Sequence, residues 1–226
     1  MLAAWPCPLP GGKTTDELAV VFAKERQHRV LLIPPLFDEH NKFRRQMVEI
    51  MRRLDHSGID SALPDCPGWN ESCAPLAEQS LTHCRSAIMA AASHFGSTHL
   101  LSFRAGALLA PPLLPGWLYA PTGGKQVLRG MLRARTLAAR EAGREEKTAE
   151  LQEIARSKGI ALAGWQIGAE LFGELEQAEV TDNERHTVIQ QGTVGGAGLW
   201  LRAEPDEDPE QADALAAIVA VGLSEA

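Results

Sequence analysis

Strand-like and helix-like segments alternate over residues 30–103, and this order constrains the fold more than any other feature of the sequence. The strand candidates are short runs closed by proline or a polar residue, at 30–33, 59–63 and 98–103. Between them, residues 41–57 and 75–95 carry apolar side chains three and four positions apart, as on one face of a helix. Strands joined through helices in this way predict an α/β protein with a mainly parallel sheet flanked by helices.

The second half of the chain predicts a helical region, two more strands and a last helix. Residues 125–158 and 169–177 are helical in composition, and a short segment near residues 160–165 separates them. Asp208 followed by Pro209 is a typical helix start, because the carboxylate can cap free N–H groups and proline suits the first helical position. We expect a single domain over residues 1–226, with a helical cap inserted at about 123–183. The two later strands are expected at 187–191 and 198–202.

The turn after the third strand, Ser102-Phe103-Arg104-Ala105-Gly106, has the pattern of a nucleophile elbow. An elbow of this kind, found in α/β-hydrolases, needs a strand, a sharp turn and an immediate helix, with small residues two positions either side of the apex. Ser102 and Gly106 are the small residues, and residues 107–110 predict a helix start. The apex is Arg104, which has no oxygen or sulfur that could accept an acyl group.

The remaining members of a Ser-His-Asp triad are tested by chain order. In α/β-hydrolases the acid follows the nucleophile and the histidine comes after the last strand. No histidine follows His186, which precedes both expected later strands, and the segment before the last helix offers carboxylates without an imidazole. Because loss of any triad member costs several orders of magnitude in rate, we do not expect ordinary serine-hydrolase activity.

Three segments carry motifs of a known group: Pro34-Pro-Leu-Phe-Asp-Glu-His-Asn-Lys-Phe-Arg-Arg45, Asp65-Cys-Pro-Gly-Trp-Asn-Glu-Ser72 and Phe103-Arg-Ala-Gly-Ala-Leu-Leu109. They resemble the exosortase A system-associated hydrolases, α/β-hydrolase-like proteins found beside bacterial exopolysaccharide and protein-sorting machinery. One subgroup carries arginine at the elbow. The chain departs from the group's pattern where Pro34 replaces a histidine, Asn70 a glycine and Glu71 an aspartate. The resemblance implies an α/β-hydrolase fold, whereas a fold alone does not establish an activity.

Arg104 is the centre of the candidate site, which lies where the parallel strands end. The guanidinium either pairs with Asp38, Asp65 or Glu71 across the strand ends, or grips a ligand carboxylate or phosphate. The candidate cleft residues are Arg104, Pro34, Pro35, Asp65, Glu71 and Ser102. Three functions remain open: a non-catalytic binding or accessory protein, an ester or thioester hydrolase that activates water with Asp65 or Glu71, and a structural subunit that self-associates through an apolar patch at 107–121.

Charge and composition narrow the partners. The net charge of −7 argues against a nucleic-acid binder. The expected partner is an anionic small molecule, which Arg104 could bind, or a protein. The uncharged segment 105–124 contains four prolines and therefore does not predict a transmembrane helix. No secretion signal is evident, which predicts a cytoplasmic protein. The four cysteines form no C-x-x-C pair, so neither a metal nor another cofactor is expected.

Two charged patches each have two interpretations. Arg129, Arg133, Arg140 and Arg144 fall within roughly 60° of one helical face at 100° per residue. They form either a solvated stripe or a docking face for an anionic partner. The acidic run 204–213 is either the solvated start of the last helix or an acidic docking site.

Overall fold

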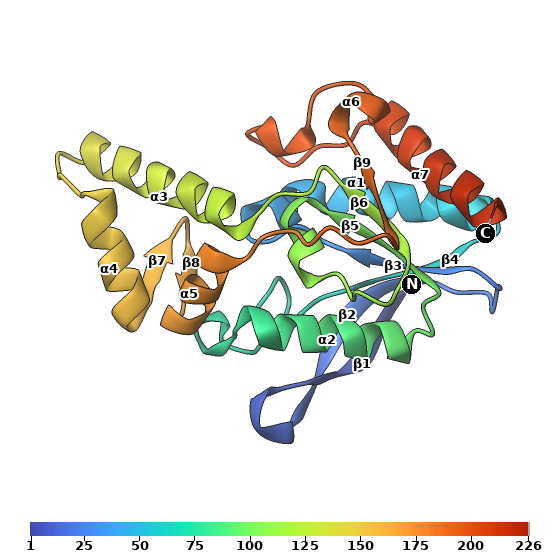
Figure 1. Ribbon diagram of the computed structural model, residues 1–226, viewed down its shortest axis with the longest axis horizontal. Helices are drawn as coiled ribbons and strands as arrows, with labels where there is room; N and C mark the ends of the chain where they lie inside the picture. The colour runs from blue at the N-terminus through green and yellow to red at the C-terminus, as the bar shows by residue number, and fades with distance from the viewer. Residues whose placement is uncertain (226) are drawn as a thin grey trace.

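The computed structural model describes residues 1–225 and has a seven-stranded sheet with helices on both faces (Figure 1). The strand order is β1-β2-β4-β3-β5-β6-β9. β1 and β2 form an antiparallel hairpin at one edge, β2 is antiparallel to β4, and the other neighbours are parallel. The strands are β1 (Leu2–Pro8), β2 (Thr14–Phe22), β3 (Arg29–Ile33), β4 (Asp60–Pro64), β5 (His99–Phe103), β6 (Gly116–Tyr119) and β9 (His186–Ile189). The predicted α/β class with a mainly parallel sheet is confirmed.

Helices α1 (Asp38–His56) and α7 (Pro209–Ser224) cover one face of the sheet, and α2 (Leu81–His94) covers the other (Figure 1). β3 illustrates the cause, because successive side chains of a strand point to opposite faces. Val30 and Leu32 pack in the cluster that contains α1 and α7, whereas Leu31 and Ile33 pack in the cluster that contains α2. β3 is thus buried on both sides, as the apolar run at 30–33 predicts.

The segment between β6 and β9 forms an arm at one side of the sheet (Figure 1). Its elements are α3 (Gly124–Glu141), α4 (Thr148–Lys158), β7 (Ile160–Leu162), β8 (Trp165–Ile167) and α5 (Ala169–Gln177). α4 ends at Gly159, whose φ of +77° suits glycine. Because the arm leaves the carboxyl end of β6, it lies beside the carboxyl edge of the parallel strands.

The last helix begins as its sequence indicates. A carboxylate oxygen of Asp208 accepts a hydrogen bond from the backbone N–H of Gln211 at 3.1 Å, and Pro209 is the first helical residue. Short elements complete the chain: η1 (Pro10–Gly12), η2 (Leu76–Glu78), η3 (Arg104–Leu109), α6 (Gln191–Val194) and η4 (Leu199–Leu201). No helix of residues 1–225 is both long enough and apolar enough to span a bilayer.

Several sequence-based boundaries are wrong. The segment expected as a strand at 198–202 is the single 3₁₀ turn η4, because Trp200 turns inward and stacks on Phe43 with ring centroids 6.0 Å apart. The elbow continues into the 3₁₀ helix η3 rather than an α-helix. α2 begins at Leu81, where Ser80 caps the N–H of His83, and not at Pro75.

Residues 107–121 contain a buried strand that the sequence does not reveal. β6 lies between β5 and β9, and all four of its residues are buried. Gly116 fits here because a Cβ would lie 2.0 Å from the carbonyl oxygen of Leu100. Leu113 is the exposed large apolar residue of this stretch, so the segment does not form the apolar patch expected for a self-associating subunit.

Candidate functional site

Strained backbone gathers at the carboxyl edge of the sheet. Positive φ angles occur at Phe37 (57°) after β3, Asn70 (48°) after β4, Arg104 (52°) after β5 and Ala120 (44°) after β6. A non-glycine residue in this region costs roughly 1–2 kcal/mol. Such strain tends to cluster at ligand-binding and active sites. The carboxyl edge of the sheet is therefore the candidate functional site.

The turn after β5 keeps the close approach of an elbow. A Cβ on Gly106 would lie 2.3 Å from the carbonyl oxygen of Pro34 and 2.8 Å from that of Ile33, so only glycine fits. Ser102 is fully buried inside the sheet, and its hydroxyl has no hydrogen-bond partner among residues 1–225. Ser102 is therefore a small, solvent-inaccessible residue where the turn after β5 packs closely against the end of β3.

Four contacts hold the Arg104 side chain. Its Nε and Nη2 donate to the two carboxylate oxygens of Glu39, at 3.2 and 3.4 Å, and its Nη1 donates to the carbonyl oxygen of Ala120 at 2.9 Å. The guanidinium carbon lies 4.1 Å from the centroid of the Trp200 ring, within the range of a cation–π contact. Arg104 thus ties together β5, β6, α1 and the segment before α7.

Glu39, rather than Asp38, Asp65 or Glu71, is the carboxylate that pairs with Arg104. The expected helix start at residue 41 is too late: α1 begins at Asp38, which brings Glu39 into its first turn beside the apex. Burial raises the pKa of Glu39 above its ordinary value, and the neighbouring guanidinium offsets only part of that rise.

A cavity of about 300 Å³ lies beside Arg104. α3 and the β7–β8 turn of the arm form much of its wall. It is lined by Leu36, Asp38, Glu39, Arg104, Thr122, Gln126, Val127, Gly130, Met131, Ala134, Ala163 and Trp200. The wall is thus apolar on the α3 side and carries one arginine and two carboxylates on the sheet side.

The other predicted site residues follow two different strands: Pro34 and Pro35 come after β3, and Asp65 and Glu71 come after β4. Pro34 and Pro35 are buried at the end of β3 and line a neighbouring hollow of only about 10 Å³. Asp65 is fully buried and accepts hydrogen bonds from Arg44 at 2.6 Å and from Asn70 at 3.0 Å. Glu71 is exposed. Of the six predicted cleft residues, Arg104 lines the cavity, whereas Pro34, Pro35, Asp65, Glu71 and Ser102 are outside its lining.

His40 belongs to the buried cluster around Asp65 and is not among the site residues predicted from the sequence. Its Nε2 lies 2.6 Å from the Asn70 amide nitrogen and 3.2 Å from Nη1 of Arg44. Burial, assisted by the Arg44 charge, lowers the pKa of His40 to about 3, so the imidazole is neutral. Its position seven residues after the end of β3 is the signal that could have identified it.

His186 lies at the opposite end of the sheet. It begins β9 opposite Gly116, the first residue of β6, and its Nε2 is 3.0 Å from the carbonyl oxygen of Leu114. This is the amino edge of the parallel strands, whereas Arg104 follows the carboxyl end of β5.

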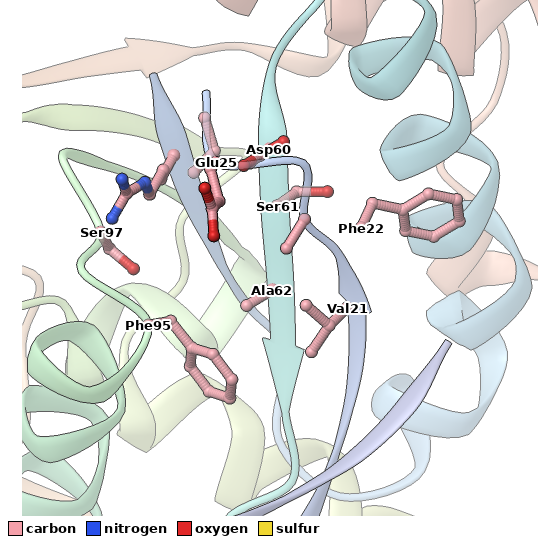
Figure 2. A pocket seen from close by; sticks show the side chains of 11 residues that line it. Val21, Phe22, Glu25, Asp60, Ser61, Ala62, Phe95 and Ser97 are labelled. Carbon is pink, nitrogen blue, oxygen red and sulfur yellow. The ribbon is translucent and has the colours of Figure 1, made fainter. Parts of the chain in front are cut away.

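A second hollow, of about 460 Å³, lies at the amino ends of β3 and β4 (Figure 2). None of the predicted site residues lines it. The carboxylate of Asp60 there is occupied, since it accepts hydrogen bonds from the backbone N–H groups of Lys24 and Arg26 at 2.9–3.0 Å. Asp60 therefore holds the loop after β2.

No family model and no curated protein matches the sequence. Solved structures match the fold at low sequence identity. Alpha/beta hydrolase domain-containing protein 10 from mouse aligns with a TM-score of 0.62 at 11% identity, over 100% of this chain and 99% of that one. A candidate hydrolase from Agrobacterium vitis S4 aligns with a TM-score of 0.57 at 10% identity, over 100% and 98% of the two chains. Est1E from Butyrivibrio proteoclasticus, solved with ferulic acid, aligns with a TM-score of 0.52 at 11% identity, over 92% and 94%.

The similarity to these solved structures agrees with the observed fold, a mainly parallel sheet with helices on both faces. The chain has the α/β-hydrolase fold.

Proposed function

We propose that the protein is a non-catalytic binding protein, in which the Ser-His-Asp triad has degenerated and the former substrate cleft binds a ligand through Arg104. The observation that carries this proposal is the contact between Arg104 at the apex and Trp200 in the segment before α7. In a serine hydrolase these two places supply the nucleophile and the histidine. Neither an arginine nor a tryptophan can attack an acyl carbon, and neither serves as a general base at neutral pH.

The cavity beside Arg104 suits a small ligand with one anionic group and an apolar body. A guanidinium has five N–H donors, and the three hydrogen bonds to Glu39 and Ala120 leave two for a ligand oxygen. Asp38 and Glu39 also line the cavity, so a multiply charged anion would be repelled. The apolar wall comes from α3, including Val127 and Met131. This wall is the reason we assign residues 123–183 as a cap over the cleft.

Two measurements test this proposal. A serine-directed fluorophosphonate probe should leave the native protein unlabelled, and stoichiometric labelling would overturn the proposal. Calorimetric titration with monocarboxylates of increasing chain length should find binding that Arg104→Gln weakens by about tenfold or more. Arg135→Gln is the matched control, because Arg135 pairs with Glu146 and does not line the cavity.

Ester or thioester hydrolysis at a non-standard site is a second candidate, and one observation favours it. Glu39 has a raised pKa and lies beside Arg104 in the cavity, which suits a carboxyl group that exchanges a proton with water. Glu39, rather than Asp65 or Glu71, would then activate the water. Turnover of short-chain esters or thioesters, abolished by Glu39→Gln in a folded protein, would support this function.

We also propose that the chain is a divergent, cytoplasmic accessory protein of bacterial exosortase or exopolysaccharide systems. This part rests on the motifs at residues 34–45, 65–72 and 103–109 alone. The arginine at the apex matches the subgroup that carries arginine there. The test is the position of its gene: neighbours that encode exosortase or polysaccharide-export components are expected, and their consistent absence would contradict the assignment.

A further inference from the structure

A row of cations without a paired carboxylate follows the exposed face of α3 and continues into the loop after it. We call it the basic row: Lys125, Arg129, Arg133 and Arg140 on α3, and Arg144 three residues beyond the end of the helix. The helical face predicted from the sequence therefore does not extend to Arg144. All five side chains belong to exposed residues, and within residues 1–225 none has a carboxylate oxygen within 4.0 Å. The nearby carboxylates of Glu146 and Glu176 already pair with Arg135 and Arg156. On a protein with a net charge of −7, this concentration of positive charge is local, and Glu145 and Glu146 are carboxylates that lie beside it.

The surroundings of the basic row disfavour a membrane as the partner. Two hollows flank the helix: Lys125 and Arg129 line one of about 580 Å³, and the remaining arginines line one of about 700 Å³. A helix that binds a bilayer buries its apolar face in the lipid, whereas the apolar face of α3, with Leu128 and Leu132, is buried in the protein. A partner that is a thin chain with protruding carboxylates fits this surface better.

The chain itself carries such a segment, which we call the acidic segment, residues 201–210. It reads Leu-Arg-Ala-Glu-Pro-Asp-Glu-Asp-Pro-Glu and contains five carboxylates and one arginine. Residues 205–208 adopt neither helix nor strand, and the two prolines favour an extended backbone. Asp206 and Glu207 pair only with the partly exposed Arg202 and the exposed Arg45, and such surface pairs contribute little. Glu204 and Glu210 are exposed and make no ion pair within residues 1–225.

The two patches also match in spacing and in apolar content. Residues four apart on a helix lie ~6 Å apart along its axis, as for Arg129 and Arg133. Alternate residues of an extended segment lie ~6.6 Å apart, a spacing that applies within residues 205–208, because Glu204 lies in a bend and Glu210 in α7. An exposed leucine accompanies each patch. Leu137, with 56% of its surface accessible, lies beside Arg133 and Arg140 of the basic row, and Leu201, with 75%, belongs to the acidic segment.

We propose that the acidic segment of one copy docks on the basic row of another copy, so that the chain associates with itself head to tail. Within one copy the two patches form no ion pair with each other, so both are available to other copies. Such a contact joins different surfaces of the two copies, and it produces a closed ring or dimer, or an open chain. This inference does not depend on the cavity beside Arg104.

The decisive experiment uses two complementary variants. The row variant is Arg129→Gln, Arg133→Gln, Arg140→Gln, which can only offer its acidic segment. The segment variant is Glu204→Gln, Asp206→Asn, Glu210→Gln, which can only offer its basic row; it keeps Asp208, the cap of α7. By sedimentation velocity the wild-type protein should associate with rising concentration. Each variant alone should associate at least about tenfold more weakly than the wild type. An equimolar mixture of the two variants should form a 1:1 heterodimer.

A control variant separates the contact from net charge. The control, Lys13→Gln, Arg52→Gln, Arg185→Gln, also removes three positive charges, but from exposed positions outside the basic row. It should associate like the wild type. The proposal is overturned if the wild-type protein stays monomeric, if the row variant associates as tightly as the wild type, or if the mixed variants do not pair. Vesicles of phosphatidylserine and phosphatidylcholine serve as the competing partner; row-dependent vesicle binding by a protein that remains monomeric would also overturn it.

Discussion

The guanidinium carbon of Arg104 lies 4.1 Å from the centroid of the Trp200 ring, and this contact joins the turn after β5 to the segment before α7. Trp200 also stacks on Phe43 of α1, with ring centroids 6.0 Å apart. A cation and an aromatic ring from two distant parts of the chain are therefore in contact at the carboxyl edge of the sheet.

Replacing the apex arginine with serine should not create a serine hydrolase. Arg104→Ser restores a hydroxyl at the elbow, but Trp200 occupies the segment from which the base would come. The variant should also lose about 2 kcal/mol of unfolding free energy, because it leaves the half-buried Glu39 without its partner. Fluorophosphonate labelling and urea unfolding measure the two effects, and rapid labelling of the variant would show that a usable base is present.

The close packing of the elbow against the end of β3 should tolerate no side chain at residue 106. In Gly106→Ala the new Cβ would lie 2.3 Å from a backbone oxygen of Pro34, which cannot move aside cheaply. We expect a loss of about 2 kcal/mol or more. Gly173→Ala in α5 is the matched control, because nothing lies within 4 Å of its Cβ and alanine favours the helix by up to ~1 kcal/mol. Equal stabilities of the two variants would contradict the packing argument.

The elbow and the central strands could be predicted from sequence because their signals are local. The run at 30–33 and the Asp208 cap each reflect a few adjacent residues, and both elements form where expected. β6 was missed because prolines and glycines surround a four-residue strand that only its neighbours β5 and β9 stabilise.

The partners of Arg104 could not be predicted, because they depend on tertiary structure. Glu39 reaches the apex because α1 starts at Asp38, three residues before the helix start expected at residue 41. Trp200 reaches it because the segment expected as a strand closes into a single turn against α1. Neither position has a local sequence signal that would distinguish it from an ordinary helix or strand residue.

Glu39 should make stability fall as pH rises through the carboxyl range. Burial raises its pKa in the folded state, so the folded protein binds the proton more tightly than the unfolded chain does. Ionising Glu39 above the unfolded-state value of about 4.3 therefore costs stability until its folded-state pKa is passed. The difference in unfolding free energy between Glu39→Gln and the wild type should therefore shift in favour of the variant as pH rises from acidic to neutral.

Glu146 provides a control of opposite sign for that measurement. Its hydrogen bond with Arg135 lowers its pKa, so its contribution is present above the unfolded-state value and is lost as pH falls through the folded-state value. Relative to the wild type, Glu146→Gln should be least stable at neutral pH and should recover on acidification. Parallel trends for the two variants would refute the assignment of the Glu39 shift to burial.

His40 should remain neutral far below the range in which histidines ordinarily titrate. Burial lowers its pKa to about 3, whereas the unfolded chain takes up the proton near pH 6.5. The sign follows from linkage: below pH 6.5 the unfolded state binds more protons, so this contribution to stability is lost as pH falls from 6.5 toward 3. His40→Gln should therefore have a flatter dependence of unfolding free energy on pH over that interval. Imidazole chemical shifts measured by NMR check the cause directly, and a midpoint for His40 near 6.5 would show that the cluster with Asn70 and Arg44 does not exclude the charged form.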